Sequence, residues 1–431
     1  MRKTLLGVLA FGIIGLASCK KNNNPDTSVT YPAMAEAADP ALLMTTTSGV
    51  KVYNGGFGSA IAADPNDPNV FYLMTDRGPN VAGTLVAGSI ILGKSDFTPS
   101  IGKFRLKDGK LVLEQTITFK NAAGANLNGL PNPVGAGSTG EIPIDLNGTL
   151  LTASADGIDS EGLVRASDGS FWVSDEYGPH IVHFDASGKT IERINPFGSG
   201  TGGRTIPLVF AKRRANRGME GLTITPDGKT LVGLMQSPMY NPSRTAVANS
   251  VVIRILTFDI ASGATKQYAY LMDNTTLTGC SEIMALSATT FLTIERDGLY
   301  GGNPTSPATF KKIFKIDISG ATDISDAANS ASGKLYGGKT VEELNDAAGL
   351  TAAGITPVTK TLALDLLKDL PGGIYPHDKA EGIALLPGNI LAISNDDDFG
   401  VVDNGASGFM AKILPGTGSV DHNRIYFVKL K

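Results

Sequence analysis

The chain has 431 residues, of which 42% are apolar and 18% are charged, so it can bury a large core and is not disordered over most of its length. Its formal net charge is -4 and it contains no basic run, which argues against a nucleic-acid partner. The 52 glycines and 23 prolines indicate many turns and favour a β over a helical architecture.

Residues 1–18 are predicted to be a targeting segment. Arg2 and Lys3 precede an apolar run over residues 5–16, which is too short to anchor the chain by crossing a bilayer. Residues 16–19, Leu-Ala-Ser-Cys, resemble a bacterial lipobox, which implies cleavage before Cys19 and attachment of lipid to this cysteine. The alternative is an ordinary secretory signal that happens to contain a cysteine.

Residues 19–44 begin with a polar run and are predicted to be a tether. Lys20 follows the cysteine, where an aspartate would resemble an inner-membrane retention signal, so we expect an outer-membrane lipoprotein of the cell envelope, monomeric and attached to the membrane through Cys19. Cys280 then has no disulfide partner and is interpreted as a buried, inert thiol.

One pattern recurs between residues 45 and 431. In each copy an apolar strand is followed by a turn, by a second strand that ends in polar or charged residues, and by further strands. Four-stranded units repeated in this way are typical of a β-propeller, in which neighbouring units cover each other's apolar faces. The five clear copies cover residues 56–119, 156–194, 217–271, 281–317 and 379–430.

Uneven spacing between the copies leaves the number of blades open. We expect one all-β propeller domain over residues 45–431, with five to seven four-stranded blades and six as the preferred number. Residues 45–52 are expected to complete the last blade and close the ring. Residues 120–150 are rich in Gly, Asn and Pro and predict a long loop, whereas a capping-box pattern at residues 340–343 predicts a short helix near residues 340–348.

Acidic residues recur at two places in the repeat. Because first strands line the central channel of a propeller, acids at their starts are expected to converge in one funnel together with acids from the ends of second strands. The first copy has Ser59 where the others have a glutamate. The first group contains Glu161, Glu220, Glu282 and Glu381, and the second includes Asp175, Glu176, Glu295 and Asp396.

So many carboxylates in a dry funnel cannot all stay ionised, so either some are protonated or a cation lies among them. Oxygen ligands in this number suit Ca²⁺ or Mg²⁺, and we expect Ca²⁺. The predicted metal ligands are Glu220, Glu282, Glu295, Glu381 and Asp396. The predicted catalytic residues are Asp159, Glu161, Asp175, Glu176 and His180, with His180 as a general acid or base near pH 7.

Basic residues among these acids predict an anionic substrate. Arg77, Arg217 and Arg296 are expected to bind it by bidentate hydrogen bonds, together with Tyr177. His377 is a second candidate for acid–base chemistry. A structural explanation remains open, because acids and arginines at blade tips often connect neighbouring blades through ion pairs.

Several motifs in this region are distinctive: D-G-I-D-S-E-G-L at 156–163, F-W-V-S-D-E-Y-G-P at 171–179, E-G-L at 220–222, K-A-E-G-I at 379–383 and S-N-D-D-D-F-G at 394–400. Together they resemble the phytase-like family, which is described by the phrase "esterase-like activity of phytase". The resemblance covers residues 45–431 and implies a β-propeller, an extracytoplasmic location and the hydrolysis of phosphate or carboxylic esters. Gly58-Ser59 departs from the pattern and leaves one side of the ring without its acid.

Two functions from different classes remain open at this point. The first is an envelope-anchored hydrolase of phosphate or carboxylic esters of small molecules, acting in the funnel with a divalent cation. Lactone hydrolysis is a further possibility within this class. The second is a non-catalytic propeller that binds a ligand or a partner at the cell envelope, since propellers serve both purposes.

Overall fold

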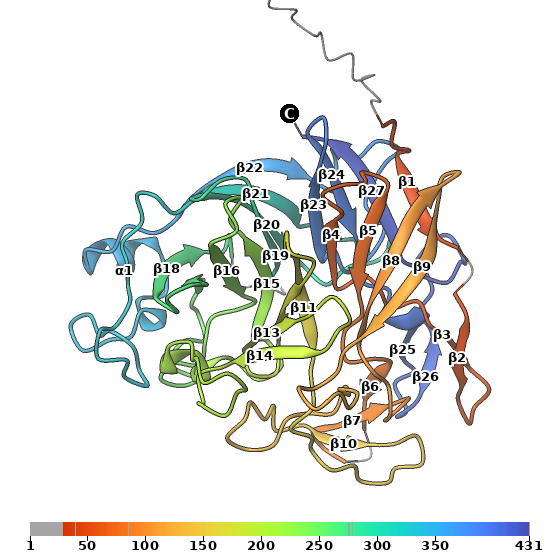
Figure 1. The fold of residues 1–431 in the computed structure, drawn as a ribbon, viewed down its shortest axis with the longest axis horizontal. Coiled ribbons are helices and arrows are strands. Elements are labelled where there is room, and N and C mark those ends of the chain that lie inside the picture. Colours follow the sequence, from red (N-terminus) through yellow and green to blue (C-terminus); the bar gives the residue numbers. More distant parts are fainter. Residues whose placement is uncertain (1–28, 39, 85, 275, 278, 431) are drawn as a thin grey trace, which may run out of the picture.

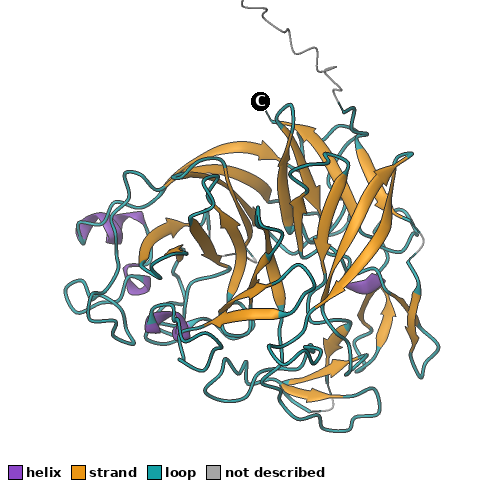
Figure 2. Cartoon of the chain, viewed as in Figure 1, coloured by secondary structure: helices purple, strands orange, loops and turns teal. Residues whose placement is uncertain are grey.

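The computed structural model describes residues 29–38, 40–84, 86–274, 276–277 and 279–430. The predicted signal peptide and Cys19 lie outside these residues. Strands form most of the regular structure and are grouped in sheets around a common centre, whereas the few short helices lie in the connections (Figure 1; Figure 2).

The propeller consists of three four-stranded sheets and one eight-stranded sheet, and the latter is two four-stranded units joined edge to edge, so there are five units, called blades 1 to 5. Blade 1 contains β4 (Ala60–Ala63), β5 (Val70–Met74), β8 (Ser100–Lys107) and β9 (Lys110–Thr118). Blade 2 contains β11 (Ser160–Arg165), β12 (Phe171–Asp175), β13 (His180–Phe184) and β14 (Thr190–Ile194). Blade 3 contains β15 (Met219–Ile224), β16 (Thr230–Met235), β17 (Val252–Asp259) and β18 (Thr265–Leu271). Blade 4 contains β19 (Gly279–Ala285), β20 (Thr290–Arg296), β21 (Lys311–Asp317) and β22 (Thr359–Asp365). Blade 5 contains β23 (Gly382–Leu386), β24 (Ile390–Ser394), β27 (Arg424–Lys429) and β1 (Met34–Ala37).

The first strands of the blades, β4, β11, β15, β19 and β23, surround the central channel. Each contacts the first strand of the next blade, and β23 contacts β4, so the ring is closed. The predicted all-β propeller is therefore confirmed. The described strands form five blades, which lies within the predicted range and is one fewer than the preferred six, because the long gaps between repeats contain small additional sheets and a helical insertion.

The ring is closed by β1, which comes from the N-terminal end of the described chain. It pairs antiparallel with β27 and parallel with β9, so that it joins blade 5 to blade 1. The prediction that residues 45–52 close the ring is wrong, because β2 (Leu42–Thr45) and β3 (Lys51–Tyr53) pair with each other in a separate hairpin. Since β1 lies within residues 19–44, the propeller begins before the predicted boundary at residue 45.

The connections between blade strands carry further small elements. β6 (Asn80–Ala82), β7 (Ser89–Leu92) and β10 (Ile142–Ile144) form a three-stranded sheet, and β25 (Val401–Asp403) pairs with β26 (Phe409–Ala411). β10 belongs to residues 120–150, so the region predicted to be a loop contains one short strand. Three short 3-10 helices are η1 (Leu208–Lys212), η2 (Glu342–Leu344) and η3 (Asp398–Gly400).

The predicted helix near residues 340–348 is present as η2 followed by α1 (Ala347–Ala352). The capping box forms as the sequence predicts: the Thr340 N–H donates to Glu343 Oε2 at 2.8 Å, and the Glu343 N–H donates to Thr340 Oγ1 at 3.3 Å. None of the described helices is long and apolar enough to cross a membrane.

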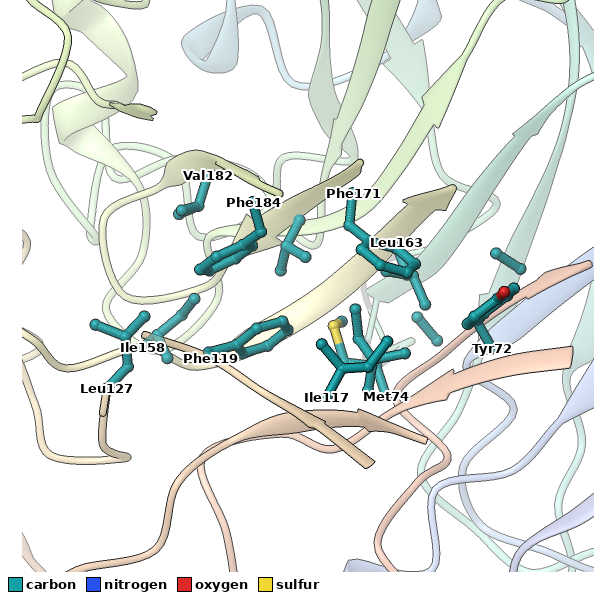
Figure 3. Close-up of a cluster of buried hydrophobic side chains, with 14 of the residues drawn as sticks. Tyr72, Met74, Ile117, Phe119, Leu127, Ile158, Leu163, Phe171, Val182 and Phe184 are labelled. Carbon is teal, nitrogen blue, oxygen red and sulfur yellow. The ribbon is translucent and has the colours of Figure 1, made fainter. Parts of the chain in front are cut away.

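The core is divided among the interfaces between blades. Between blades 1 and 2, Ile117 and Phe119 lie against Leu163 and Phe184 (Figure 3), and the rings of Phe119 and Phe184 stack with their centroids 4.3 Å apart. Similar apolar clusters lie at the other four interfaces. Each blade therefore buries both of its faces, which is the physical reason for the repeated strand pattern in the sequence.

The role of β1 in closing the ring can be tested with two substitutions in adjacent residues. Ala35 is fully buried and Met34 is exposed. We expect Ala35→Asp to lower the free energy of unfolding by roughly 3 kcal/mol or more, because it buries an unpaired carboxylate. Met34→Asp is the control and should cost less than about 0.5 kcal/mol. Urea unfolding measures both, and equal small effects would contradict closure by β1.

Candidate active site

Strand pairing places one residue of each blade at the same position, where the first strand enters the channel. These five residues, called the first-strand ring, are Ser59, Glu161, Glu220, Ser281 and Glu381. In β11 and β15 the register shifts by one residue at the glutamate, and such a bulge changes the direction of a side chain. The following glycine is needed because a Cβ at Gly162 would lie 2.4 Å from the backbone N of Leu222 in the next blade.

The prediction that Glu282 belongs to this ring is wrong. In β19 the extra residue is Ser281, so Glu282 takes the position that Gly162 has in β11. Glu282 Oε1 accepts a hydrogen bond from the Ile283 N–H at 2.8 Å, and Glu282 lines the opposite, mostly apolar end of the channel. Burial raises the pKa of Glu282 well above its usual value. It is therefore separated by one register step from the other glutamates.

A second set of equivalent residues follows the second strands. The residues of this second-strand ring are Asp76, Glu176, Gln236, Arg296 and Asp396. Because side chains alternate along a strand, the residues one position earlier point away from the channel. This separates Glu176 and Asp396 from Asp175 and Glu295, which the sequence analysis placed in one funnel.

Three carboxylates from blade 2 come together where the two rings meet. One oxygen from each of Asp159, Glu161 and Glu176 lies within 4.8 Å of the other two. The Glu176 N–H donates to the carbonyl oxygen of Asp159 at 2.8 Å, which fixes the start of β11 against the end of β12. Asp159 and Glu176 are buried, and Glu161 is partly exposed. These residues are called the acidic triad below.

The triad is electrostatically strained. Burial raises the pKa of Asp159 to about 7, and burial together with Glu220 raises the pKa values of Glu161 and Glu176 well above their usual range. Carboxylates this close favour either shared protons or a bound cation. Three hard oxygen donors fit Ca²⁺ or Mg²⁺.

Glu220 extends this acidic group into blade 3. Its Oε1 accepts a hydrogen bond from Gln236 Nε2 at 2.7 Å, whereas its buried Oε2 has no hydrogen-bond partner among the described residues. Burial and the charge of Glu381 raise the pKa of Glu220 to about 7. A buried carboxylate oxygen without a partner is costly, so this atom indicates a place for a proton or a ligand.

Arg296 fills the side of the ring that lacks a glutamate. Its Nε donates to Ser281 Oγ at 2.8 Å, and its Nη2 is hydrogen-bonded to Glu381 Oε1. Arg296 was predicted to bind substrate, but both of these contacts are to residues of the first-strand ring. It is therefore placed to hold Glu381 in position.

Asp175 and His180 belong to a separate, buried network. Asp175 Oδ2 lies 2.5 Å from His180 Nδ1 and accepts from Arg193 Nη2 at 2.9 Å. His180 Nε2 lies 3.1 Å from the carbonyl oxygen of Ala136. Burial opposes ionisation of Asp175, but His180 and Arg193 hold its pKa below the usual value. Both nitrogens of His180 are engaged, so the geometry gives Asp175 and His180 positioning roles in place of the predicted catalytic ones.

Arg77 and Tyr177 are also engaged with protein groups. Arg77 donates to Glu141 at 3.0 Å and to Asn216 at 3.1 Å, and its Nε lies 3.6 Å from Asp159 Oδ2. The buried Tyr177 hydroxyl donates to the carbonyl oxygen of Gly129 at 2.7 Å. The contacts position Asp159 and do not leave Tyr177 available for a substrate.

Arg217, also predicted to bind substrate, lies beside the triad and is partly exposed. Burial and the neighbouring Arg214 lower its pKa, and the charges of Glu176 and Glu220 oppose this effect. Its guanidinium therefore lies in the field of the same carboxylates that surround the candidate site.

Glu295 and Asp396 are in different surroundings. Glu295 is hydrogen-bonded to Tyr270 and Lys360, outside the channel. Asp396 lies in the second-strand ring, where its Oδ2 accepts from Lys379 Nζ at 2.6 Å. The predicted metal ligands are thus not brought together as one group, and the triad consists of residues predicted to be catalytic.

His377, the second acid–base candidate, is buried. Its Nδ1 lies 2.6 Å from Asp421 Oδ1 and its Nε2 lies 2.8 Å from the Tyr426 hydroxyl. Cys280 is buried and free, as predicted, and burial raises its pKa well above the usual value.

The family described as "Phytase-like: Esterase-like activity of phytase" matches residues 53–399, which is most of the chain. The chain belongs to the phytase-like family. This confirms the resemblance that the motifs indicated, and the matched range contains every residue of both rings.

A curated relative of this phytase-like protein is an "Uncharacterized secreted protein" of Arthroderma benhamiae, 30% identical over 274 residues. The match covers 50% of this chain and 51% of the relative, so the chain spans about half of that protein's length. Solved structures that resemble the fold include a PQQ-bound aldose sugar dehydrogenase of Streptomyces coelicolor, at 11% identity and a TM-score of 0.34, with 93% of this chain and 100% of that chain covered. A protein of Lactobacillus plantarum has the same identity and TM-score, with coverages of 89% and 91%.

Sequence reasoning missed the residues that hold the acids of this phytase-like protein. They include Arg193, Gln236 and Lys379, which contact Asp175, Glu220 and Asp396. For Gln236 a signal was present, because it stands directly after a second strand, as Glu176 does. For Arg193, on the outermost strand of its blade, the sequence offers no such register argument.

The raised pKa of Glu220 predicts a pH-dependent stability difference between this protein and Glu220→Gln. Between pH 4.5 and 7 the folded wild type keeps a proton on Glu220 that the unfolded chain has lost, so its stability falls as pH rises. Glutamine does not titrate. In metal-free protein, Glu220→Gln should therefore gain stability relative to the wild type from pH 5 to pH 8, by up to about 3 kcal/mol. Urea unfolding at both values checks this, and a difference independent of pH would contradict it.

The positioning role of Asp175 gives a second prediction. Asp175→Asn should lower the free energy of unfolding by about 3 kcal/mol, because it leaves Arg193 without its buried partner. Glu161→Gln, in the partly exposed triad residue, should cost much less and should instead abolish cation binding. Thermal unfolding and Ca²⁺ titration measure the two effects, and the reverse assignment would show that Asp175 is a ligand.

Proposed function

We propose that this phytase-like protein hydrolyses phosphate or carboxylic esters of small molecules at the acidic end of its channel, with a divalent cation, preferably Ca²⁺, held by Asp159, Glu161 and Glu176. The observation that supports this proposal is the convergence of the three carboxylates. When bound, such a cation supplies Lewis acidity toward an ester oxygen and a water molecule.

The surrounding residues have distinct parts in this proposal. Arg217 donates to the anionic oxygens of the ester from its partly exposed position. Glu220, with one unpartnered oxygen, accepts or returns the proton, which replaces the role first assigned to His180. Arg77 and Arg296 hold Asp159 and Glu381 in place.

The proposed location is the cell envelope, with a lipid on Cys19 that attaches a monomeric protein to the outer membrane. The lipobox-like residues 16–19 support this location, as does the description of the Arthroderma relative as secreted. The tether between Cys19 and β1 would then be short, which keeps the propeller near the membrane.

The alternative is a propeller that binds a ligand without catalysis. One observation favours it: Ser160 Oγ donates to the carbonyl of Thr75 at 2.7 Å, and both nitrogens of His180 are engaged. These residues therefore do not form a serine–histidine nucleophile. Any catalysis would have to come from the carboxylates, and without it the propeller only binds a ligand.

The deciding experiment measures hydrolysis of inositol hexakisphosphate, p-nitrophenyl phosphate, p-nitrophenyl acetate and a lactone, with Ca²⁺, with Mg²⁺ and after chelation. We expect turnover that chelation abolishes and that Glu161→Gln lowers by at least about 100-fold, the range for loss of a group that acts on the transition state. Glu114→Gln, in an exposed residue of β9, is the matched control.

Cation binding is followed in the same samples by thermal unfolding, since a ligand that binds the folded state raises the midpoint. Turnover that persists after chelation would reject the cation. A folded wild type without turnover on any substrate would reject the hydrolase and leave the binding propeller.

A further inference from the structure

A cavity other than the central channel is lined by residues close in the chain to Arg217 and Gln236. It has a volume of about 260 Å³ and is lined by Arg214, Arg244, Ser237 and Tyr240, among other residues, none of them acidic. The charge of the cavity is therefore opposite to that of the triad, because two arginines and a serine hydroxyl line it.

The backbone joins this cavity directly to the candidate site. Ser237 follows Gln236, whose side chain donates to Glu220. Arg214 is joined to Arg217 by a hydrogen bond from the Arg217 N–H to the Arg214 carbonyl at 3.1 Å. The segments that carry Arg217 and Gln236 thus also supply Arg214 and Ser237 to the cavity.

The polar groups of the cavity are only partly satisfied by described residues: Ser250 Oγ accepts a hydrogen bond from the Val252 N–H at 3.2 Å. Ser237 is 4% exposed, and its buried Oγ has no hydrogen-bond partner among the described residues. No ion pair to a described residue is formed by Arg214 or Arg244. The Arg214 guanidinium lies 5.8 Å from the centre of the Tyr240 ring, which supports the side chain. A buried hydroxyl without a partner among the described residues, in a cavity that two arginines also line, indicates a ligand that accepts hydrogen bonds.

We propose that this cavity binds an anionic group of the substrate, a carboxylate or a phosphate, other than the ester that is cleaved. Guanidinium groups bind such oxyanions bidentately, and the serine hydroxyl supplies a further donor. The inference rests on the proposed function and narrows it: the substrate is an ester that carries a second negative charge, with its reacting group at the triad and its charged group between Arg214 and Arg244.

The binding part of the proposal is tested without turnover. Inorganic phosphate and succinate are titrated by calorimetry into metal-free protein, so that neither anion can bind through a cation. We expect Arg214→Gln and Ser237→Ala to weaken binding, the former by roughly tenfold or more, the loss expected for a charge-assisted hydrogen bond. The control is Lys229→Gln, an exposed cation at the far end of the same hairpin.

The anion with the higher affinity identifies a carboxylate or a phosphate as the group recognised. Binding that is absent from the wild type, or that is equal in all three variants, would overturn the anion site. Thermal unfolding confirms that each variant is folded.

The substrate part is tested by comparing p-nitrophenyl acetate with the singly charged p-nitrophenyl succinate. We expect Arg214→Gln to raise KM for the succinate ester at least fivefold and to leave kcat/KM for the acetate unchanged. Equal effects on both esters would overturn the assignment. If the wild type cleaves neither ester and phosphate binding still depends on Arg214, the proposed hydrolase fails while the anion site remains, so the two failures are distinguishable.

Discussion

Many carboxylates meet where the five blades surround the channel. The rest of the structure depends on keeping these carboxylates apart or neutralising their charge. The two rings contain Glu161, Glu220 and Glu381 in one and Asp76, Glu176 and Asp396 in the other, and most of these side chains are buried. Charges at such distances in a low-dielectric interior repel one another strongly. At one side of the ring this repulsion is offset by two ion pairs: Arg296 pairs with Glu381, and Lys379 pairs with Asp396. At the other side no lysine among the described residues pairs with the acidic triad; Arg77 Nε lies 3.6 Å from Asp159 Oδ2, and the charge of Arg217 acts on Glu176.

This asymmetry indicates which part of the ring is functional. A fully paired cluster is sufficient to connect blades, and the structural explanation considered for all these acids holds for Asp175, Glu295 and Asp396. It does not account for Glu220 Oε2, which is buried without a partner among the described residues. Protein interiors rarely leave such an atom unsatisfied, so blades 2 and 3 carry the stronger evidence for a ligand.

Much of the fold could be predicted from the sequence because every blade of a propeller has the same strand pattern and the same packing contacts. The paired glycine and glutamate in D-S-E-G and M-E-G marks the position where one first strand approaches the next, and the apolar alternation marks both faces of each blade. Site residues were predicted wrongly where one extra residue shifts the pairing register of a strand. Glu282 stands where the sequence repeat places a glutamate, but the bulge in β19 is at Ser281, and no local pattern distinguishes the two. β1 was missed for another reason: a strand of four residues that pairs with the opposite end of the chain has no local signature.

Strand register also explains why the sequence predicted where the site lies but not which of its residues contact one another. Neighbours such as Asp175 and Glu176 look alike in the sequence, yet alternation along β12 sends Asp175 to Arg193 and Glu176 to the channel. The alternation also has a functional consequence. Asp175 faces away from the channel and fixes the end of β12 through buried hydrogen bonds. These bonds hold Glu176 in place against the repulsion of the neighbouring carboxylates. Because its oxygens cannot separate, a preorganised acidic group of this kind is neutralised either by protons or by a cation. The cavity that Arg214 and Arg244 line carries the opposite charge, and in the function we propose it would orient the anionic end of a substrate.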